Sequence, residues 1–526
     1  MQRLVCGLLL LLPAFSHAGS EWTFADMTSD LGVSWQHFLE FGPFSTPDYM
    51  TGGLAAADID NDGWVDLYIP QGDLFNGRLL RNLGNGQFTD VASAWTLEVN
   101  RGPNESSYAT GAAFADLTGN GFPDLLLGGI RGFGLRLYLN DGTAFTEQTT
   151  AWGLAGALQH HISASFADVN GDQRLDVALG HWDNSQPSGS IGHLWLNLGD
   201  GLNLAGDDWG ISAAFSSGDY SFTPNFADFN HDGWPDLVVS SDFGTSQTFL
   251  NQQGLSLSNT TTAVISDENG MGGAVGDYDN DGDLDWFVSA IWDATPDVPW
   301  GSSGNRLYRN DGNGVFSDVT DAAGVRQGEW GWGACMMDFN NDGHLDIFHV
   351  NGWNTPGSPF QNDPSRLFVN QGNGQFVEQA MLRGIADSAQ GRGVVCFDYD
   401  RDGDIDVFIQ NNQGIGSAYR NNASSNGNHW LGLILNAPLP NRSAIGARVQ
   451  LVSASGVQTR EMQIPNHYAS TSPAELLFGL GNDAVVSELR IEWPDGQHSR
   501  VIYTAPDQWL TLDHPDLDHL WGDDFE

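Results

Sequence analysis

A nine-residue acidic segment recurs seven times along the chain and constrains its fold more than any other feature. The first copy is Asp58–Asp66, with the sequence D-I-D-N-D-G-W-V-D, and successive copies start 58, 52, 60, 49, 61 and 60 residues apart. Such a period, with matching flanks, is typical of stacked copies of one supersecondary unit. The later copies begin at Asp116, Asp168, Asp228, Asp277, Asp338 and Asp398.

Each copy carries oxygen-bearing side chains at its positions 1, 3, 5 and 9, usually with a glycine at position 6. Alternate oxygen ligands on a tight turn converge on one point, which is how proteins bind Ca²⁺. Two carboxylates about 4 Å apart repel by about 4 kcal/mol at an effective dielectric constant near 20, so a cation is expected among them. One isolated loop of this kind is more often a solvated turn, but seven in register favour metal binding.

We therefore predict up to seven Ca²⁺ ions. The predicted ligands are Asp58, Asp60, Asp62 and Asp66; Asp116, Thr118, Asn120 and Asp124; Asp168, Asn170, Asp172 and Asp176; Asp228, Asn230, Asp232 and Asp236; Asp277, Asp279, Asp281 and Asp285; Asp338, Asn340, Asp342 and Asp346; and Asp398, Asp400, Asp402 and Asp406. The loops are not EF-hands, because an apolar β-rich run follows each one where an EF-hand would begin its second helix.

The copies are expected to differ in affinity. Those at Asp58, Asp277 and Asp398 offer four carboxylates each and should bind most tightly. The copy at Asp116 has only two carboxylates, and the copy at Asp168 has Gln in place of the position-6 glycine, so these two should bind most weakly.

The flanks of the loops predict an all-β fold. A strand of small residues precedes each loop, an apolar strand follows it, and two further strands complete the repeat. Four strands per repeat and seven repeats predict a seven-bladed β-propeller over residues 19–424. The last repeat lacks its fourth strand, whose unmatched counterpart is W-T-F-A-D-M-T at residues 22–28. The N-terminal strand should therefore complete the seventh blade and close the ring.

The period ends after the propeller. Residues 429–512 carry alternating β-like runs and are expected to form a separate small β domain, followed by an acidic tail at 513–526. Residues 1–18 have the pattern of a secretory signal peptide. No later apolar run is long enough to span a membrane. These features predict a secreted protein, located in the medium, on the cell surface or in the periplasm.

Composition narrows the possible partners and chemistry. The net charge of −46 excludes nucleic acid and anionic membranes as partners. The absence of lysine excludes Schiff-base and P-loop chemistry. Outside the predicted signal peptide the cysteines are Cys335 and Cys396, which stand three and two residues before their loops. The period-two rule then places them on opposite strand faces, so a disulfide between them is not expected.

Tryptophans gather in the connections opposite the acidic loops. Trp182, Trp292, Trp300 and Trp353 lie in the longest connections between second and third strands. They either pack over blade edges or form an aromatic recognition surface for a glycan or peptide. In the second case His181, Asp183 and Arg392 could add polar contacts. No histidine pair has zinc-site spacing, so His160, His161 and His349 are interpreted as ordinary structural or solvated side chains.

The loops, with the F-A-D segments before them, resemble FG-GAP/VCBS repeats, the calcium-binding blades also found in integrin α-subunit heads. Residues 429–505 resemble an ASPIC/UnbV domain through the motifs N-R-S-A-I-G-A-R-V from Asn441, Y-A-S-T-S from Tyr468, F-G-L-G from Phe478 and I-E-W-P-D-G from Ile491. Together they are similar to the cartilage acidic protein family and its bacterial relatives. The resemblance implies an extracellular calcium-binding protein of adhesion or interaction type and names no ligand. No Cys-rich EGF-like module, which animal members append, is seen here, so a matrix role is not carried over.

Three functions are compatible with these patterns. The first is a secreted, non-catalytic, calcium-dependent binding protein with the propeller as recognition platform for an extracellular protein or glycan. The second is an extracellular enzyme on a polysaccharide or peptide that uses the Trp-bearing face, and the third is a structural surface component. We favour the first, because acid–base carboxylate pairs occur only inside the acidic loops and no nucleophile with a base stands out.

Overall fold

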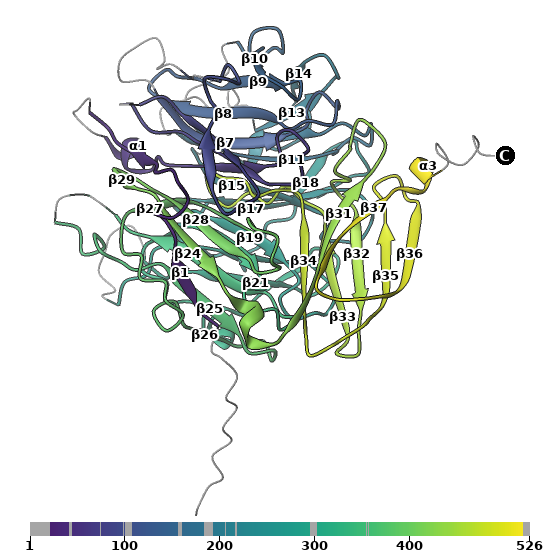
Figure 1. Ribbon diagram of the computed structural model, residues 1–526. Coiled ribbons are helices and arrows are strands. Elements are labelled where there is room, and N and C mark those ends of the chain that lie inside the picture. Colours follow the sequence, from purple (N-terminus) through teal and green to yellow (C-terminus); the bar gives the residue numbers. More distant parts are fainter. Residues whose placement is uncertain are drawn as a thin grey trace, which may run out of the picture.

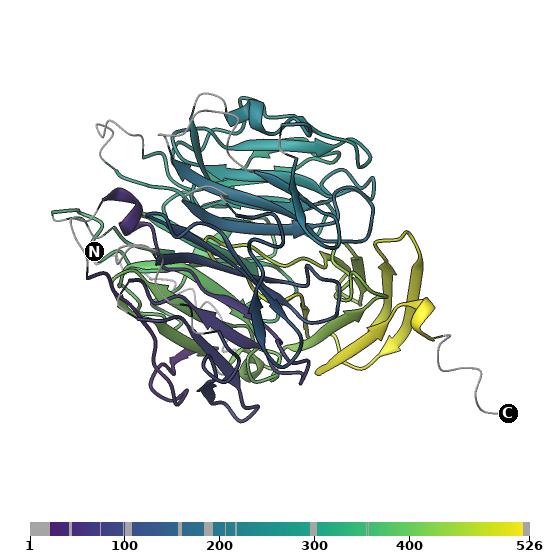
Figure 2. The same ribbon diagram turned by 90° about the horizontal axis from the view of Figure 1, so that it is seen from above.

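The computed structural model describes residues 22–518 apart from 41–44, 74, 98, 100–107, 156–159, 184–192, 206, 216–217, 295–301, 354 and 356. The predicted signal peptide and residues 519–526 of the acidic tail lie outside the described residues. A body of small β-sheets is joined on one side by a second β unit, coloured yellow-green to yellow (Figures 1 and 2). No helix within the described ranges is long and apolar enough to cross a membrane.

Each repeat folds into one antiparallel unit of four strands. The acidic loop connects the first two strands, and the aspartate at its position 9 begins the second strand. Five units are separate sheets, whereas the third and fourth are joined into an eight-stranded sheet. The strands are β3 (Ala55–Ala57), β4 (Asp66–Ile69), β5 (Arg78–Asn82) and β6 (Phe88–Asp90); β7 (Tyr108–Ala115), β8 (Asp124–Ile130), β9 (Arg136–Asn140) and β10 (Phe145–Glu147); β11 (His161–Ala167), β12 (Asp176–Asp183), β13 (Leu194–Asn197) and β14 (Leu202–Leu204); β15 (Asp219–Ala227), β16 (Asp236–Ser241), β17 (Gln247–Asn251) and β18 (Leu257–Asn259); β19 (Gly273–Gly276), β20 (Asp285–Val288), β21 (Arg306–Asn310) and β22 (Phe316–Asp318); β23 (Gly331–Met337), β24 (Asp346–Asn351), β25 (Arg366–Asn370) and β26 (Phe376–Glu378); and β27 (Gly391–Phe397), β28 (Asp406–Asn411) and β30 (Ser417–Asn421).

The N-terminal segment joins the last unit. Strand β1 (Phe24–Asp26) pairs antiparallel with β30, so the sheet order is β1-β30-β28-β27. Nearby, β2 (Gln36–His37) pairs with β29 (Gly414–Ile415). The short helices are α1 (Thr46–Tyr49), α2 (Thr320–Ala323) and α3 (Pro515–Asp518), with 3-10 turns at Ser212–Phe215 and Ala423–Asn426.

Small residues in the first strands lie where neighbouring units approach closely. A Cβ added to Gly333 would stand 2.6 Å from the carbonyl oxygen of Arg392 in the next unit, and one on Gly111 would stand 2.0 Å from that of Ile162. The seventh unit approaches the first in the same way, because Gly393 N–H donates to Gly52 O at 2.8 Å. Larger side chains would separate these strands, which explains the runs of Gly and Ala.

The C-terminal unit contains two sheets that pack against each other and against the repeats. One sheet has the order β34-β31-β37 and the other β33-β32-β35-β36. The C-terminal unit shares a hydrophobic core with the repeats, since Leu433 and Phe478 belong to one buried apolar cluster with Leu117 and Trp195 of the repeats. The strands are β31 (His429–Asn436), β32 (Arg448–Val452), β33 (Val457–Glu461), β34 (Leu476–Gly481), β35 (Val486–Glu492), β36 (His498–Thr504) and β37 (Gln508–Asp513).

One loop of the C-terminal unit, residues 466–472, enters the space between the first strands of the repeats; we call it the axial loop. Its backbone or side chains form hydrogen bonds with the first strands of six of the seven units. At its tip Tyr468 is fully buried, packs against Phe222 and Trp332, and donates its hydroxyl hydrogen to Met50 O at 2.7 Å. The axial loop therefore fixes the C-terminal unit to the centre of the repeats.

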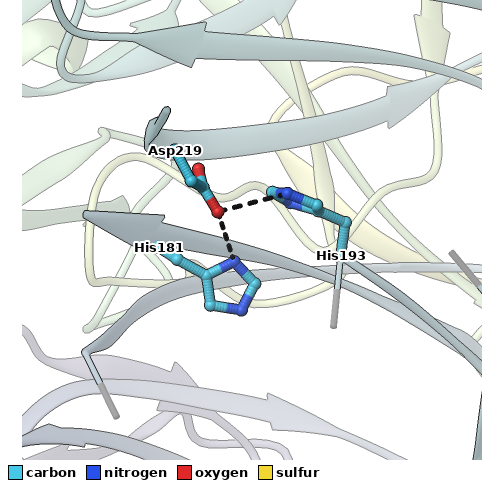
Figure 3. A group of neighbouring side chains, drawn as sticks. All are labelled: His181, His193 and Asp219. Carbon is cyan, nitrogen blue, oxygen red and sulfur yellow. Dashed lines mark ion pairs between the residues drawn. The ribbon is translucent and has the colours of Figure 1, made fainter. Parts of the chain in front are cut away.

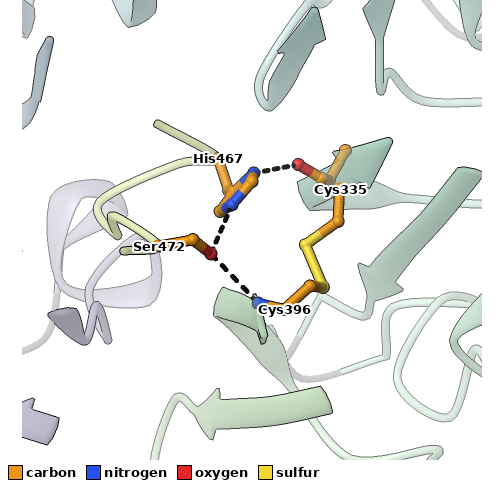
Figure 4. Close-up of a disulfide and its surroundings, with 5 residues drawn as sticks. Cys335, Cys396, His467 and Ser472 are labelled. Carbon is orange, nitrogen blue, oxygen red and sulfur yellow. Dashed lines mark hydrogen bonds between the residues drawn. A yellow bond between two sulfur atoms is a disulfide. The ribbon is translucent and has the colours of Figure 1, made fainter. Parts of the chain in front are cut away.

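Cys335 and Cys396 form a disulfide, so the expectation of two unpaired cysteines was wrong (Figure 4). They lie on β23 and β27, the first strands of two adjacent units, with their Cα atoms 6.5 Å apart. Adjacent sheets present opposite faces to each other. A disulfide between adjacent sheets therefore joins a residue on one face of β23 to a residue on the opposite face of β27. Cys335 and Cys396, three and two residues before their loops, meet this requirement.

His467 of the axial loop holds the strands that carry the disulfide. Its Nδ1 lies 2.7 Å from Ala334 O, and its Nε2 lies 2.8 Å from Ser472 Oγ, which accepts the N–H of Cys396 at 3.1 Å (Figure 4). Because Nδ1 faces a carbonyl, it carries the proton, and the neutral ring accepts from Ser472 at Nε2. A second proton on the ring would break this network.

We expect mild acid to destabilise the protein through His467. Burial lowers the pKa of His467 to about 4, although its bond to Ala334 O acts in the opposite direction. In the unfolded chain the pKa is about 6.5. Below pH 6.5 the unfolded state therefore binds a proton that the folded state does not, and stability falls by about 1.4 kcal/mol per pH unit as the pH drops toward 4. Between pH 7 and pH 5 this effect amounts to about 2 kcal/mol.

Urea unfolding at pH 7 and pH 5 measures this effect in wild type and in His467→Gln. The loss between the two pH values should be about 2 kcal/mol smaller in His467→Gln. His498→Gln is the control, because His498 is exposed, and it should retain the wild-type loss. The same pH dependence in all three proteins would contradict the role given to His467.

Candidate metal centre

The seven acidic loops share one hydrogen-bond pattern around position 1. In the first loop the Asp58 carboxylate accepts the N–H groups of Asp62, at 3.1 Å, and Gly63, at 2.8 Å. The equivalent two bonds are present in the other six loops. The oxygen at position 5 accepts the N–H of position 7 in every copy. Each loop therefore wraps around its first carboxylate.

The aspartate at position 9 ties the loop to the rest of its unit. Asp66 Oδ2 accepts from Ile59 N–H at 3.2 Å and its Oδ1 from Asn82 N–H at 2.7 Å, and equivalent bonds recur in every repeat. Both oxygens are thus engaged by the backbone. Position 9, predicted as a metal ligand, has this structural role in addition.

The asparagine that ends each third strand connects neighbouring units. Asn140 Nδ2 donates at 2.9 Å to Ile59 O, in the loop of the preceding unit. The same bond is made in each of the other repeats. In the first repeat the acceptor is Tyr399 O of the last one, at 2.9 Å. The seven bonds therefore run from unit to unit and return from the first to the last.

Carboxylate oxygens converge in the three loops that carry four carboxylates. Groups with ligand atoms within 4.8 Å of one another are Asp58, Asp60 and Asp62; Asp277, Asp279 and Asp285; and Asp398, Asp400 and Asp406. In each of these loops the Oδ1 of the position-3 aspartate (Asp60, Asp279 or Asp400) is buried without a hydrogen-bond partner among the described residues. A buried, negatively charged oxygen without a partner is costly. An oxygen of this kind is suited to a cation.

Without a bound cation, burial disfavours the ionised form of the carboxyl groups at position 1. Burial raises the pKa of Asp58 to about 6 and that of Asp277 and Asp398 to about 7, with neighbouring loop carboxylates adding to the rise and loop N–H groups opposing it. These pKa values are those of the protein without a bound ion. A bound cation would stabilise the ionised form and return these pKa values toward the ordinary range.

The three repeats that have an aspartate at position 3 also have an arginine near the end of the third strand. Arg81, Arg309 and Arg420 stand just before the third-strand asparagine in the three loops with four carboxylates, whereas Leu or Val stands there in the other four repeats. Arg81 binds Asp60 and Asp62 at 2.7 Å each. Arg420 binds Asp400 at 2.7 Å and Asp402 at 2.8 Å. Arg309 instead binds Asp311, next to the third-strand asparagine, at 2.5 Å. In the loops at Asp58 and Asp398 the extra carboxylate is therefore matched by an extra cation that sequence analysis did not identify, although the pattern is visible in the sequence.

The third loop keeps the common geometry despite its unusual sequence. Gln173 takes the position of the usual glycine with φ +68°, and Gly171, two positions earlier, has φ +77°. Other loops have positive φ at both places, as at Asn61 and Gly63. The Asp168 carboxylate still accepts the N–H groups of positions 5 and 6. The altered sequence thus strains one residue but does not change the turn.

The C-terminal unit covers the last three loops. Arg448 Nη2 donates to Gly282 O at 2.5 Å, and Trp509 Nε1 donates to Asp398 Oδ2 at 3.0 Å. Arg460 is buried close enough to Asp277 and Asp338 for both carboxylates to oppose the fall in its pKa that burial causes. The loops at Asp58, Asp168 and Asp228 have exposed residues at positions 4 to 6, and the loop at Asp116 has one at position 5. The seven loops therefore differ in how far they are exposed.

The predicted tryptophans that the structure describes do not form one open surface, because one of them is buried. Trp353 is buried in a stack with Trp330, at a ring distance of 4.7 Å, and Trp332, at 5.8 Å, with the Arg392 guanidinium 4.3 Å from the Trp332 ring. Trp182 is half-buried and donates to Asp242 Oδ2 at 3.1 Å. Trp292 is also half-buried, and Trp300 and the Asp183 side chain lie outside what the structure describes. Packing therefore accounts for Trp353.

The polar groups predicted to assist the tryptophans are buried. Arg392 is 0% and His181 1% exposed, so neither is available at an open surface. Arg392 instead donates to the carbonyl oxygens of Tyr49 and Gly352. His161 and His349 are buried, in agreement with the structural alternative. Burial lowers the pKa of His349 to about 3, so its ring is neutral.

Comparison with known proteins agrees with the resemblance seen in the sequence. A family model described as FG-GAP-like repeat matches residues 228–288, 293–349 and 357–409, and one described as ASPIC and UnbV matches residues 438–518. Cartilage acidic protein 1 from Mus musculus is 28% identical over 251 residues, which cover 37% of this chain and 38% of the mouse protein. Its Xenopus tropicalis counterpart is 23% identical over 518 residues, which cover 86% of this chain and 72% of that protein.

Two solved structures show a likeness of lower degree. The WD40 β-propeller domain of Doa1 is 11% identical, with a TM-score of 0.41, over 77% of this chain and 98% of that one. An Agrocybe aegerita lectin that recognises non-reducing terminal N-acetylglucosamine is 18% identical, with a TM-score of 0.39, over 62% of this chain and 79% of that one. The chain is therefore an all-β protein of FG-GAP-like repeats with an ASPIC and UnbV domain, and cartilage acidic protein 1 is among its homologues.

Proposed function

We propose that the chain is a secreted, non-catalytic interaction protein whose seven units close into a propeller braced by Ca²⁺. The observation that carries the calcium proposal is the buried Oδ1 without a partner in each of the three loops with converging carboxylates. Hard carboxylate oxygens on a tight turn are the ligands that Ca²⁺ takes. The ring of asparagine bonds that returns from the first unit to the last supports closure.

The side chains at positions 1, 3 and 5 would hold the ion in the loop at Asp58, and those at positions 1, 3 and 9 in the loops at Asp277 and Asp398. Position 9 also accepts the backbone bonds described above. On this basis the loops at Asp58, Asp277 and Asp398 bind most tightly. Those at Asp116 and Asp168, with two and three carboxylates, bind most weakly. A buried disulfide is typical of proteins from oxidising compartments and supports secretion.

An extracellular protein or glycan is the partner class that the charge and the exposed chemistry favour. A net charge of −46 repels polyanions. Trp182 and Trp292 remain half-buried and could contribute aromatic contacts. The carboxylates that converge are engaged in the loops, where they would act as ligands and not as acids or bases. This arrangement favours binding over hydrolysis of an extracellular polymer.

A glycan and extracellular-protein array, probed with the full chain in Ca²⁺ and in EDTA, tests the proposal. A ligand bound in Ca²⁺ and released by EDTA is the expected result. Turnover of an arrayed polymer would identify an enzyme instead. Calcium-independent binding, or no ligand in either condition, would count against calcium-dependent recognition.

Replacing Arg81 with Leu should tighten calcium binding at the first loop. The guanidinium competes with the ion for Asp60 and Asp62, and Leu is the residue found at this place in three other repeats. These ion pairs are partly exposed, so the gain is modest, about 3- to 10-fold in Kd. Calorimetric titration of calcium-free protein measures the change.

Arg78→Leu is the matched control. Arg78 lies on the same strand but faces Asp90 at 3.7 Å, away from the loop, so its replacement should leave calcium affinity unchanged. Weaker calcium binding by Arg81→Leu would show that the arginine organises the loop instead of competing with the ion.

A further inference from the structure

Two histidines and an aspartate meet in the interior of the third and fourth repeats, away from the acidic loops (Figure 3). They are His181 on β12, His193 just before β13 and Asp219 at the start of β15. Their side chains are 1%, 4% and 0% exposed. The site exists because β12 pairs with β15 of the next unit, with Asp183 opposite Asp219. This pairing joins the two units into the eight-stranded sheet.

The distances between these groups have the size expected around a tetrahedral metal ion. Asp219 Oδ2 lies 3.2 Å from His193 Nε2 and 3.5 Å from His181 Nδ1. Ligand atoms 2.0–2.1 Å from a tetrahedral ion lie about 3.3–3.4 Å from each other. The three ligand atoms all lie within 4.8 Å of one another. One ion can therefore contact all three after small side-chain movements.

Within the described part of the chain, hydrogen bonds of normal geometry engage only one oxygen of the Asp219 carboxylate, and the other is an ion-pair partner of the two imidazoles. Asp219 Oδ1 accepts from Ser221 Oγ at 2.8 Å and from Ser221 N–H at 3.1 Å. Asp219 Oδ2, which faces both imidazoles, accepts no hydrogen bond of normal geometry from the described residues. A buried carboxylate oxygen in this situation needs a positive charge.

Outer contacts orient the three side chains as ligands. His193 Nδ1 faces Leu179 O at 3.4 Å, which keeps the proton on Nδ1 and leaves the Nε2 lone pair directed at the site. Ser221 holds the aspartate and also bonds the His181 backbone. Phe215 stacks on the His193 ring at 4.4 Å and forms an apolar wall. A carbonyl behind the histidine and a hydroxyl behind the carboxylate are the outer contacts of protein metal sites.

We propose that His181 Nδ1, His193 Nε2 and Asp219 Oδ2 form a binding site for a divalent transition-metal ion of the Zn²⁺ class. Two imidazole nitrogens and one carboxylate oxygen suit Zn²⁺, whereas Ca²⁺ takes oxygen ligands only. The site is thus chemically distinct from the acidic loops. Three protein ligands leave a fourth position for water or another imidazole, and the His161 ring lies edge-on to His181 at 4.7 Å.

Titration of the full chain with Zn²⁺ in saturating Ca²⁺ tests the proposal, because Ca²⁺ occupies oxygen-only sites. The expected stoichiometry is about one Zn²⁺ per chain. His193→Gln and Asp219→Asn should each weaken binding more than about 100-fold, beyond the 10- to 100-fold effect of losing an outer contact. Ser221→Ala, which removes such an outer contact, should weaken it about 10-fold. His160→Asn is the matched control, since this neighbouring histidine has no ligand role and Asn tolerates its φ of +71°.

X-ray absorption of the Zn²⁺-loaded wild type provides a readout that does not depend on the folding of any variant. Two imidazoles and an oxygen at about 2.0–2.1 Å are expected. A shell of oxygens only, retention of the Zn²⁺ by His193→Gln and Asp219→Asn, or no bound Zn²⁺ in wild type would each overturn the proposal. The last result would leave the group as a buried histidine–aspartate ion pair. None of these outcomes depends on whether the acidic loops bind Ca²⁺.

Discussion

Chelation with EDTA should reduce the free energy of unfolding by about 8 kcal/mol relative to the protein in about 10 mM Ca²⁺. Extracellular modules bind Ca²⁺ with Kd values from about 10⁻⁴ M. At 100 times Kd, one bound ion stabilises the folded state by about 2.7 kcal/mol. The three loops with converging carboxylates would together supply the 8 kcal/mol. Because domains are typically stable by only about 5–15 kcal/mol, the chelated protein should be close to unfolding.

Urea unfolding in Ca²⁺, in EDTA and in Mg²⁺ measures this dependence. Mg²⁺ requires near-octahedral geometry and retains its water, so it should restore little of the lost stability. Asp279→Asn, which places at position 3 the residue found in three other loops, should weaken the response to Ca²⁺ by removing one converging carboxylate. Glu147→Gln, an exposed change outside the loops, is the control. Identical unfolding midpoints in Ca²⁺ and EDTA would refute a stabilising ion.

The same experiment bears on how the two parts of the protein are held together. The C-terminal unit covers the loops at Asp277, Asp338 and Asp398, and Trp509 donates to the Asp398 carboxylate that would bind the ion. Without calcium, these clustered carboxylates repel one another beneath the C-terminal unit. Chelation should therefore expose the interface between the two parts before the repeats unfold, which hydrogen exchange of β31 and β37 would detect.

The repeat made the order of the strands predictable. Each acidic segment marks where one strand ends and the next begins, and its position-9 aspartate accepts backbone N–H groups of its own unit. The same logic gave the pairing of β1 with β30, since an unmatched strand needs a partner. Hairpins could thus be predicted because the residues that form them are close together in the sequence.

Contacts between units were harder to predict, because they depend on how one sheet faces the next. The parity rule was applied to Cys335 and Cys396 as if they shared one strand, and it led to the wrong conclusion about the disulfide. His181, His193 and Asp219 have no regular spacing and meet only through the exceptional pairing of β12 with β15. Arg81, by contrast, follows a pattern that comparison of the repeats alone could have revealed.

Truncating the side chain at the tip of the axial loop should also lower the free energy of unfolding strongly, because this loop joins the C-terminal unit to the repeats. Tyr468 is fully buried between Phe222 and Trp332. Its hydroxyl is the donor to Met50 O, close to helix α1. Removal of a buried aromatic ring costs about 3–5 kcal/mol, and the unsatisfied carbonyl of Met50 adds about 1 kcal/mol. Tyr468→Ala is therefore expected to lower the free energy of unfolding by about 4–6 kcal/mol.

Two further variants separate the contribution of the Tyr468 ring to stability from that of its hydroxyl group and from a nonspecific effect of truncation. Tyr468→Phe retains the ring and should lose only about 1–2 kcal/mol. Tyr503→Ala makes the same truncation in the C-terminal unit at a side chain that is 79% exposed, so its effect should stay within about 0.5 kcal/mol. Urea unfolding followed by the fluorescence of the 19 tryptophans, which include Trp332 beside Tyr468, measures the change in stability. If Tyr468→Ala unfolds at the wild-type urea concentration, the axial loop does not hold the C-terminal unit in the repeats, and the interface must depend on the contacts around Arg448 and Trp509 instead.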